Sequence, residues 1–169
     1  MARSSRRHFG AAASLASLLC SACLYGFAGG GFASHLKTVA ILPFDNLTPD
    51  PALTREVSEA VRDALESRLG LRVAGEATAD MLVRGRVVRY EPGIAVAVQA
   101  GQGTFRVNSR QVQLVVDVEL IDQKEGKPVW QRQGLMVIGD YEEGREAEGR
   151  RIAMQKLINE IVDGAQSQW

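Results

Sequence analysis

The residue with the clearest chemical signature is Cys23, which closes the segment Cys20-Ser21-Ala22-Cys23. A cysteine thiol can carry a thioether-linked diacylglycerol, and bacterial lipoprotein processing requires small residues directly before the modified cysteine. Ser21 and Ala22 meet that requirement. Cys20 departs from the pattern, because Leu usually stands three residues before the cut. We therefore predict that Cys23 is the lipid-bearing first residue of the mature protein.

The residues ahead of Cys23 have the order of an export signal. Arg3, Arg6 and Arg7 form a basic start, and residues 9–19 are apolar and uncharged. An ordinary cleaved signal peptide and a membrane-spanning helix are the alternatives. The apolar run is well short of the roughly 20 residues that a spanning helix needs, which disfavours the second. The order of segments favours a lipoprotein signal.

Residue types that support catalysis are sparse. His8 lies in the leader and His35 stands alone, so neither a histidine-based triad nor a multi-histidine metal site can be assembled. Asp117 and Glu119 have the spacing of an acid pair, but this pattern is typical of the solvated face of a strand. Gly101-Gln102-Gly103 lacks the Gly-Lys-Ser/Thr that completes a phosphate-binding loop. We expect no enzyme activity, cofactor or metal.

Charge and cysteine content narrow the class of protein further. Three of the 20 basic residues precede Cys23 and all 20 acidic residues follow it, so the mature chain has a formal net charge of −3. Nonspecific nucleic-acid binding therefore has no electrostatic support. The only cysteines are Cys20 and Cys23, so no disulfide can form within the mature domain. The core must stabilise it unaided in an oxidising compartment.

The chain divides into three expected parts. Residues 1–22 are the lipoprotein signal peptide, and residues 23–35 are the lipidated N-terminus with a glycine-rich tether that includes Gly29-Gly30-Gly31. Residues 36–169 form a single periplasmic domain, because the mature chain has the commonest length of one domain. Its 46% hydrophobic and 24% charged residues are ordinary for a globular protein.

The first expected elements are a strand and a helix. Residues 37–42 form a nearly continuous apolar run that predicts a strand, and Pro43 ends it. Asp50-Pro51 marks a helix start, as N-cap and first-turn proline, and Gly70 marks the helix end. Residues 71–73 predict a short strand. The helix presents one apolar stripe that recurs every four residues: Leu53, Val57, Val61, Leu65 and Leu69.

A long hairpin is expected next. Residues 81–90 predict a half-exposed strand that Pro92-Gly93 interrupts, and residues 94–98 resume it. The tip is expected at residues 100–103, where glycines favour a turn. Residues 112–120 alternate apolar and polar side chains strictly, so they predict the return strand, with one face in the core and the other in water.

A further strand and a second helix complete the pattern. Residues 124–127 predict a tight turn, and residues 129–138 the next antiparallel strand. Glu142 and Glu143 are expected in the first turn of the helix, where acidic side chains favour the N-terminus. The apolar stripe of this helix comprises Ile152, Met154, Leu157, Ile158, Ile161 and Val162.

This order predicts an α+β two-layer sandwich. Two helices pack on one face of a mixed, mostly antiparallel sheet of about four strands. The other face carries Arg84, Arg86, Asp117 and Glu119, and we expect it to remain in water or to meet a partner.

Several segments of the mature chain resemble the LptE family of LPS-assembly lipoproteins. That family commonly begins with Cys-Gly-Tyr-x-Phe and continues through a Lys-Thr-(Ile/Val)-Ala-Ile strand into a Phe-Glu-Asn-x-Thr turn. Leu24 departs from it, since the family usually has Gly there. The matching segments are residues 23–27, 34–41, 43–48, 79–85, 89–91 and 126–130.

The resemblance implies a two-helix, four-stranded sandwich at the periplasmic face of the outer membrane, anchored by its N-terminal lipid. It also implies that the protein plugs an LptD-like β-barrel and binds lipopolysaccharide during delivery to the cell surface. Only the acylated Cys23 carries over by motif. The long hairpin of residues 92–109 adds Arg106 and, just after it, Arg110, whose guanidinium groups could pair with lipid phosphates.

A second resemblance points to another class of function. Residues 39–48, 50–52 and 79–85 are also similar to the periplasmic domains of the CsgG secretion lipoproteins and the penicillin-binding-protein activator LpoB. Those relatives would make the protein a pore subunit or a regulator of a peptidoglycan synthase. The sequence lacks the additional long amphipathic hairpins of a pore, and Tyr25 and Phe27 favour LptE.

Overall fold

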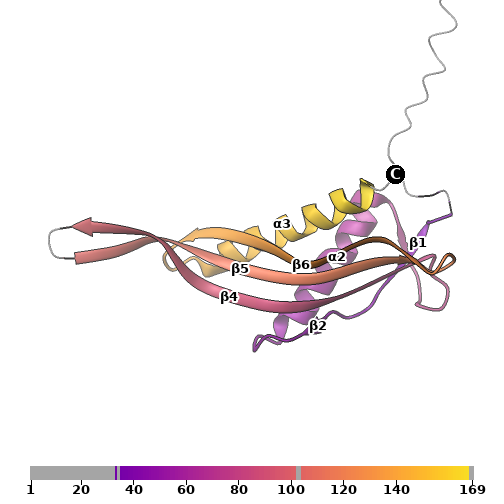
Figure 1. The fold of residues 1–169 in the computed structure, drawn as a ribbon, viewed down its shortest axis with the longest axis horizontal. Coiled ribbons are helices and arrows are strands. Elements are labelled where there is room, and N and C mark those ends of the chain that lie inside the picture. Colours follow the sequence, from indigo (N-terminus) through magenta and orange to yellow (C-terminus); the bar gives the residue numbers. More distant parts are fainter. Residues whose placement is uncertain (1–32, 34, 102–103, 168–169) are drawn as a thin grey trace, which may run out of the picture. The chain divides into compact units, whose positions relative to one another are not determined.

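The computed structural model describes residues 33, 35–101 and 104–167, with side chains assigned except at 97–101 and 104–108. These residues form one mixed sheet with two helices (Figure 1). Within these ranges, no helix has both the length and the hydropathy to cross a bilayer.

The sheet has six strands. Five of them lie in the order β3-β1-β4-β5-β6, and the sixth, β2, pairs with β4. β1 is parallel to both β3 and β4, whereas β4, β5 and β6 form an antiparallel meander. The sheet is therefore mixed and mostly antiparallel, as predicted. The strands are β1 (Thr38–Ile41), β2 (Asp45–Asn46), β3 (Arg72–Val73), β4 (Met81–Gly101), β5 (Thr104–Asp122) and β6 (Lys127–Glu142).

The prediction of about four strands is wrong, and β2 is the strand that the sequence did not indicate. Asp45 and Asn46 look like part of a turn, because two polar residues have no strand periodicity. They nevertheless pair in parallel with Arg86 and Val87 of β4. The amide of Leu47 also donates to the carbonyl oxygen of Val87 at 2.9 Å. Tertiary pairing thus determines this strand.

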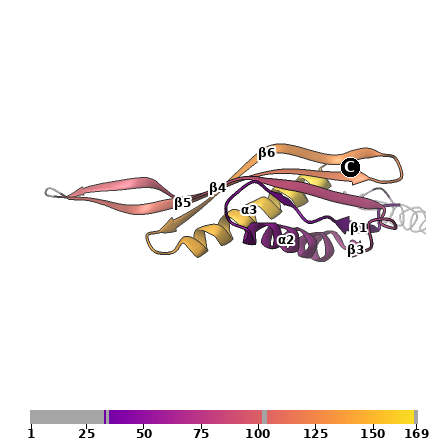
Figure 2. The same ribbon diagram turned by 90° about the horizontal axis from the view of Figure 1, so that it is seen from below.

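Helices α2 (Ala52–Leu69) and α3 (Glu146–Gln166) cover the same face of the sheet (Figure 2). The N-cap of α2 is Pro51, one residue after the predicted Asp50, and the carboxylate of Asp50 accepts the amide of the first helical residue, Ala52, at 3.0 Å. Gly70 ends α2 with a φ of 67°, in the left-handed region that favours glycine. The predicted stripe of α2 lies in the core, where Leu53, Val57, Val61 and Leu65 are fully buried.

The expected start of the second helix is wrong. Glu142 belongs to β6, where it pairs with Ser109, and α3 begins at Glu146. The buried ring of Tyr141 keeps the chain in the sheet through this position. Glu146 and Glu148 are the acidic residues of the first helical turn. Strand pairing therefore overrides a charge pattern that suits a helix N-terminus.

The expected interruption at Pro92-Gly93 is wrong, because β4 continues through these two residues to Gly101. The sheet accommodates the pair by a register shift between Glu91 and Ile94, and Gly93 has a φ of 82°. Proline is tolerated in a strand at such a bulge. Ala100 and Gly101 of the predicted tip are paired with Phe105 and Thr104, and residues 102–103 lie outside the described part. Beyond the end of β6, β4 and β5 continue together as a two-stranded ribbon (Figure 1).

Candidate docking surface

The three predicted site residues have different outcomes. Cys23 lies outside the described residues, and so does the side chain of Arg106, whose backbone pairs with Gln99. Arg110 is described and its guanidinium has two partners. It donates to the carbonyl oxygen of Gly93 at 3.0 Å and to the carboxylate of Glu143 at 2.9 Å. An anion at Arg110 would therefore compete with Glu143.

The sheet face opposite the helices, here called the outer face, carries the polar side chains that the sequence singled out. Strand alternation explains its composition, since Val83 and Val87 point into the core and Arg84 and Arg86 point away from it. Its polar part is a shallow basin of about 390 Å³. The charged residues that line the basin are Asp45, Arg84, Arg86, Asp117, Glu119 and Arg132.

The charges of the outer face are largely neutralised within the protein. Arg84 and Glu119 are 2.8 Å apart across β4 and β5, and Arg86 lies 3.7 Å from Asp45 of β2. The carboxylate of Asp117 accepts the amide of Gly134 at 2.7 Å. The basin holds three arginines and three acidic residues, so it has no formal net charge.

An apolar strip crosses the outer face beside this basin. It consists of Val88 of β4, Val115 of β5 and Met136 of β6, and we call it the outer strip. Val115 pairs with Met136 of β6 and with Arg89 of β4, and Val88 is the unpaired residue at the register shift between Val87 and Arg89. Val88 is 36% exposed and Met136 is 54% exposed. No element among the described residues covers this strip.

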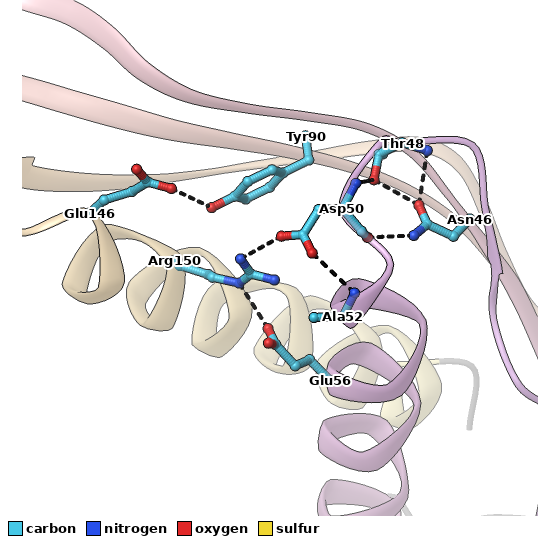
Figure 3. A network of polar contacts seen from close by, with 8 residues as sticks. All are labelled: Asn46, Thr48, Asp50, Ala52, Glu56, Tyr90, Glu146 and Arg150. Carbon is cyan, nitrogen blue, oxygen red and sulfur yellow. Dashed lines mark hydrogen bonds and ion pairs between the residues drawn. The ribbon is translucent and has the colours of Figure 1, made fainter.

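A second polar cluster joins the two helices to the sheet on the inner side (Figure 3). Arg150 of α3 lies 2.7 Å from Asp50, just before α2, and 2.8 Å from Glu56 in the first turns of α2. Its guanidinium also lies over the ring of Tyr90 of β4, 5.0 Å from the ring centroid. The hydroxyl of Tyr90 contacts Glu146 at 3.3 Å.

The charged and polar groups of this cluster bind one another and so connect α3, the start of α2 and β4. The hydrogen bond from Arg150, followed by the amide of Ala52, lowers the pKa of Asp50. Burial raises the pKa of the Tyr90 hydroxyl above its usual range. Arg150 lies far from all sequence-predicted site residues along the chain, and only the packed structure shows its role.

The point where the chain enters the fold is held by two carboxylates. His35 contacts the carboxylate of Asp122 at 2.6 Å, and the same side chain accepts amides of the turn after β5, at Lys124 and Glu125. Asp80, just before β4, accepts the hydroxyl of Thr38 at 2.7 Å and the amide of Thr38 at 2.9 Å. These contacts attach the end of the predicted tether to the sheet.

No group of three or more His, Cys, Asp or Glu side chains in the described part of the chain is placed to hold a metal ion.

A family model described as LptE, lipopolysaccharide assembly, matches residues 36–164. The chain belongs to the LptE family. The matched range runs from just before β1 into the last turns of α3, which confirms the resemblance that the sequence motifs indicated. The outer face, the outer strip and the Arg150 cluster are thus features of an LptE-family domain.

Solved structures resemble this LptE-family chain in fold. Hypothetical protein CT253 from Chlamydia trachomatis is 16% identical with a TM-score of 0.53, over 78% of this chain and 96% of that one. Protein XCC0632 from Xanthomonas campestris is 14% identical with a TM-score of 0.52, over 78% and 86%. The PelC dodecamer from Paraburkholderia phytofirmans is 18% identical with a TM-score of 0.50, over 82% and 89%. At such identities the likeness shows the fold alone.

No curated protein matches the chain. Family membership therefore rests on the family model, and the fold on the solved structures.

Proposed function

We propose that this protein is an outer-membrane lipoprotein that partners an LptD-like β-barrel in lipopolysaccharide transport and assembly. The observation that carries the proposal is the match to a lipopolysaccharide-assembly family over residues 36–164. The protein contributes surface to this process and no catalysis. The outer face supports this role, because it is a sheet surface that no element of the described chain covers.

The lipid anchor is the second part of the proposal. Cys23 follows a basic and then apolar leader, and it is preceded by the small residues Ser21 and Ala22. The residues between Cys23 and His35 span at most about 40 Å when fully extended. A lipid at Cys23 thus holds the folded domain close to the periplasmic face of the outer membrane.

Affinity purification of the protein from native outer membranes tests the partnership. We expect a large β-barrel protein to copurify, and depletion of the protein should leave newly made lipopolysaccharide beneath the cell surface. Recovery of a peptidoglycan synthase, or of a ring of identical subunits, together with normal lipopolysaccharide display would contradict the proposal. That result would favour the CsgG- or LpoB-like alternative.

Mass spectrometry of the mature N-terminus tests the anchor. We expect a diacylated residue 23 and an uncleaved precursor for Cys23→Ser. Cys20→Ser is the matched control, because it removes the neighbouring thiol and should leave processing intact. An unmodified mature start downstream of residue 23 would refute the assignment.

We also propose that Arg106 and Arg110 contact lipid phosphates. Arg106→Gln and Arg110→Gln should each lower the amount of lipopolysaccharide that copurifies, because each removes a guanidinium donor. Glu143→Gln is the control for Arg110, since it breaks the same ion pair but keeps the arginine. Unchanged lipopolysaccharide recovery in both arginine variants would eliminate this site.

A further inference from the structure

We propose that Arg110 braces the ribbon at its base and that Gly93 is the hinge about which the ribbon turns when this brace is broken. The ribbon is defined here as residues 94–101 of β4 and 104–108 of β5 (Figure 1). The inference does not depend on the proposed function, because every group of the brace belongs to the protein itself. It assigns Arg110 a role in positioning the ribbon.

The ribbon has little support from neighbouring strands. Within the described chain, its two strands pair only with each other. The last residue of β6, Glu142, pairs with Ser109, and β2 pairs with β4 only at Arg86 and Val87. Two strands without further neighbours are marginally stable in water. The direction of the ribbon is therefore determined where the ribbon joins the sheet.

The backbone of β4 is irregular at this junction. A register shift between Glu91 and Ile94 leaves Pro92 and Gly93 outside the pairing with β5. Gly93 has a φ of 82°, in a region that glycine enters without steric cost. A bulge bends its strand locally, and a few residues of this kind can absorb the change in backbone angles at a hinge. The ribbon can therefore turn at this junction.

The guanidinium of Arg110 spans the junction with two hydrogen bonds. Nη1 donates to the carbonyl oxygen of Gly93 at 3.0 Å, and Nη2 donates to the carboxylate of Glu143 at 2.9 Å. Glu143 directly follows β6, so the guanidinium connects the hinge in β4 to the segment between β6 and α3. The planar guanidinium holds its two acceptors in a fixed geometry. It thus prevents the hinge from moving away from β6.

The brace is stronger than an isolated surface ion pair. A single exposed pair contributes little to stability, but the side chain of Arg110 is only 30% exposed and has a backbone acceptor besides Glu143. Tyr141 of β6 pairs with Arg110, and its ring is buried. Its hydroxyl oxygen lies 3.8 Å from the position that a Cβ atom would take at Gly93. Side chains from both β5 and β6 therefore limit movement of the hinge.

A small rotation at the base displaces the ribbon considerably. A strand rises about 3.3 Å per residue, so residue 99 lies about 20 Å beyond Gly93, and a turn of about 20° moves it by about 7 Å. The brace therefore determines which positions the ribbon can reach.

The distance between two spin labels on the full-length lipoprotein tests the brace. The labels are attached to Gln99→Cys on the ribbon and to Arg151→Cys, at an exposed position of α3. Double electron–electron resonance then gives the distribution of their separation, and mass spectrometry counts the labels. A third label would show a free thiol at Cys20 or Cys23, which counts against the proposed anchor and not against the brace. Cys20→Ser or Cys23→Ser then restores the measurement.

Three variants of the labelled protein are compared. Arg110→Gln removes the guanidinium that makes both hydrogen bonds. Arg110→Lys keeps the positive charge but lacks the planar fork that joins two acceptors. Arg89→Gln is the matched control, because Arg89 is also an arginine near the base of the ribbon, and its ion pair with Glu91, at 3.9 Å, lies within β4. Thermal unfolding establishes that each variant is folded.

We expect a single narrow distribution for the labelled protein without further substitutions and for Arg89→Gln. In Arg110→Gln and Arg110→Lys, the distribution should broaden or shift by about 7 Å, the displacement that a turn of about 20° causes. The first label is then moved to Glu91→Cys, on the opposite side of Gly93 along the strand. At this position the distribution should stay narrow in Arg110→Gln.

Unchanged distributions in folded Arg110→Gln and Arg110→Lys would overturn the brace. A broad distribution without either substitution, or an equal effect of Arg89→Gln, would overturn it as well. A narrow distribution in Arg110→Lys would show that charge alone holds the ribbon, which also contradicts the inference. Broadening at Glu91→Cys would refute Gly93 as the hinge. Arg110→Lys decides the question if Arg110→Gln does not fold.

Discussion

Gly139 of β6 and Gly149 of α3 bring a strand and a helix into direct backbone contact. A Cβ atom added to Gly139 would overlap the carbonyl group of Gly149, and one added to Gly149 would overlap the ring of Tyr141. Neither glycine has a positive φ, so close packing, and not backbone conformation, requires glycine at both positions. This pair sets how closely α3 approaches the sheet.

Gly139→Ala should therefore lower the free energy of unfolding by about 1–3 kcal/mol, the usual cost of overpacking. The cost arises because the obstacle is backbone, which cannot rotate away. Gly75→Ala is the matched control, since its added Cβ would find its nearest atom at 3.8 Å and its φ is not positive. Equal urea midpoints for the two variants would contradict the proposed packing.

Arg150→Met should destabilise the fold by about 1–3 kcal/mol, between the cost of breaking a surface and a buried ion pair. The substitution keeps an apolar side chain over Tyr90 but leaves Asp50 and Glu56 without their partner. Arg145→Met is the control, because Arg145 is 63% exposed and its ion pairs are 3.6 and 3.8 Å long. Arg145→Met should lower the free energy of unfolding by less than about 0.5 kcal/mol. Urea unfolding of both variants compares the two.

Acid should destabilise the protein below about pH 4. The pKa of Asp80 is lowered by the hydroxyl of Thr38 and by backbone amides. Burial raises the pKa of Asp122, but hydrogen bonds from His35 and turn amides outweigh it and lower that pKa. Hydrogen bonding to Arg150 likewise lowers the pKa of Asp50.

Because these carboxylates are ionised in the folded state at a lower pH than in the unfolded chain, their stabilisation is complete above the unfolded value of about 3.9. It is lost as the pH falls through the folded values. Urea midpoints at pH 7, 5 and 3 should show the decline, and Asp80→Asn should make it shallower. Glu160→Gln, at an exposed position of α3, is the control. A decline that is equally steep in Asp80→Asn would exclude Asp80 as a cause.

Leu65→Ala should cost about 2–5 kcal/mol, because Leu65 is fully buried in the core. Leu47→Ala removes the same atoms from a side chain that is 65% exposed, and it should leave the thermal midpoint nearly unchanged. Val118→Ala tests the strand side of the same core separately. If both core variants matched the wild type in thermal unfolding, the assignment of the buried face would be wrong.

The sequence predicted those elements in which one residue type recurs with a regular period. The four-residue repeat from Leu53 to Leu65 and the alternation from Val112 to Leu120 both lie in the core as expected. Prediction from the sequence was wrong where pairing with a distant strand determines the backbone conformation. β2 exists because β4 supplies hydrogen bonds to it, and Glu142 stays in β6 because β5 lies beside it.

In the candidate site, too, strand alternation predicted some residues, and only the packed structure revealed the others. Alternation along β4 and β5 predicted that Arg84, Arg86, Asp117 and Glu119 share the outer face. The same alternation places Val88 on this face, but only the strand register shows that Val115 and Met136 lie beside one another there and that Arg89 pairs with Val115. The cluster around Arg150 was also missed, since its partners come from a helix start and a strand that are distant in the sequence.

The position of β1 between β3 and β4 has a mechanical consequence. Both neighbours are parallel to β1, and the chain reaches β1 from His35 at its N-terminal end. Tension applied to the preceding residues therefore acts along the strand axis and loads the hydrogen bonds of β1 in shear. All of them must yield together, whereas a strand that is peeled from one side loses its bonds one at a time. A lipid at Cys23, as proposed, would therefore load the domain through the more resistant of the two geometries.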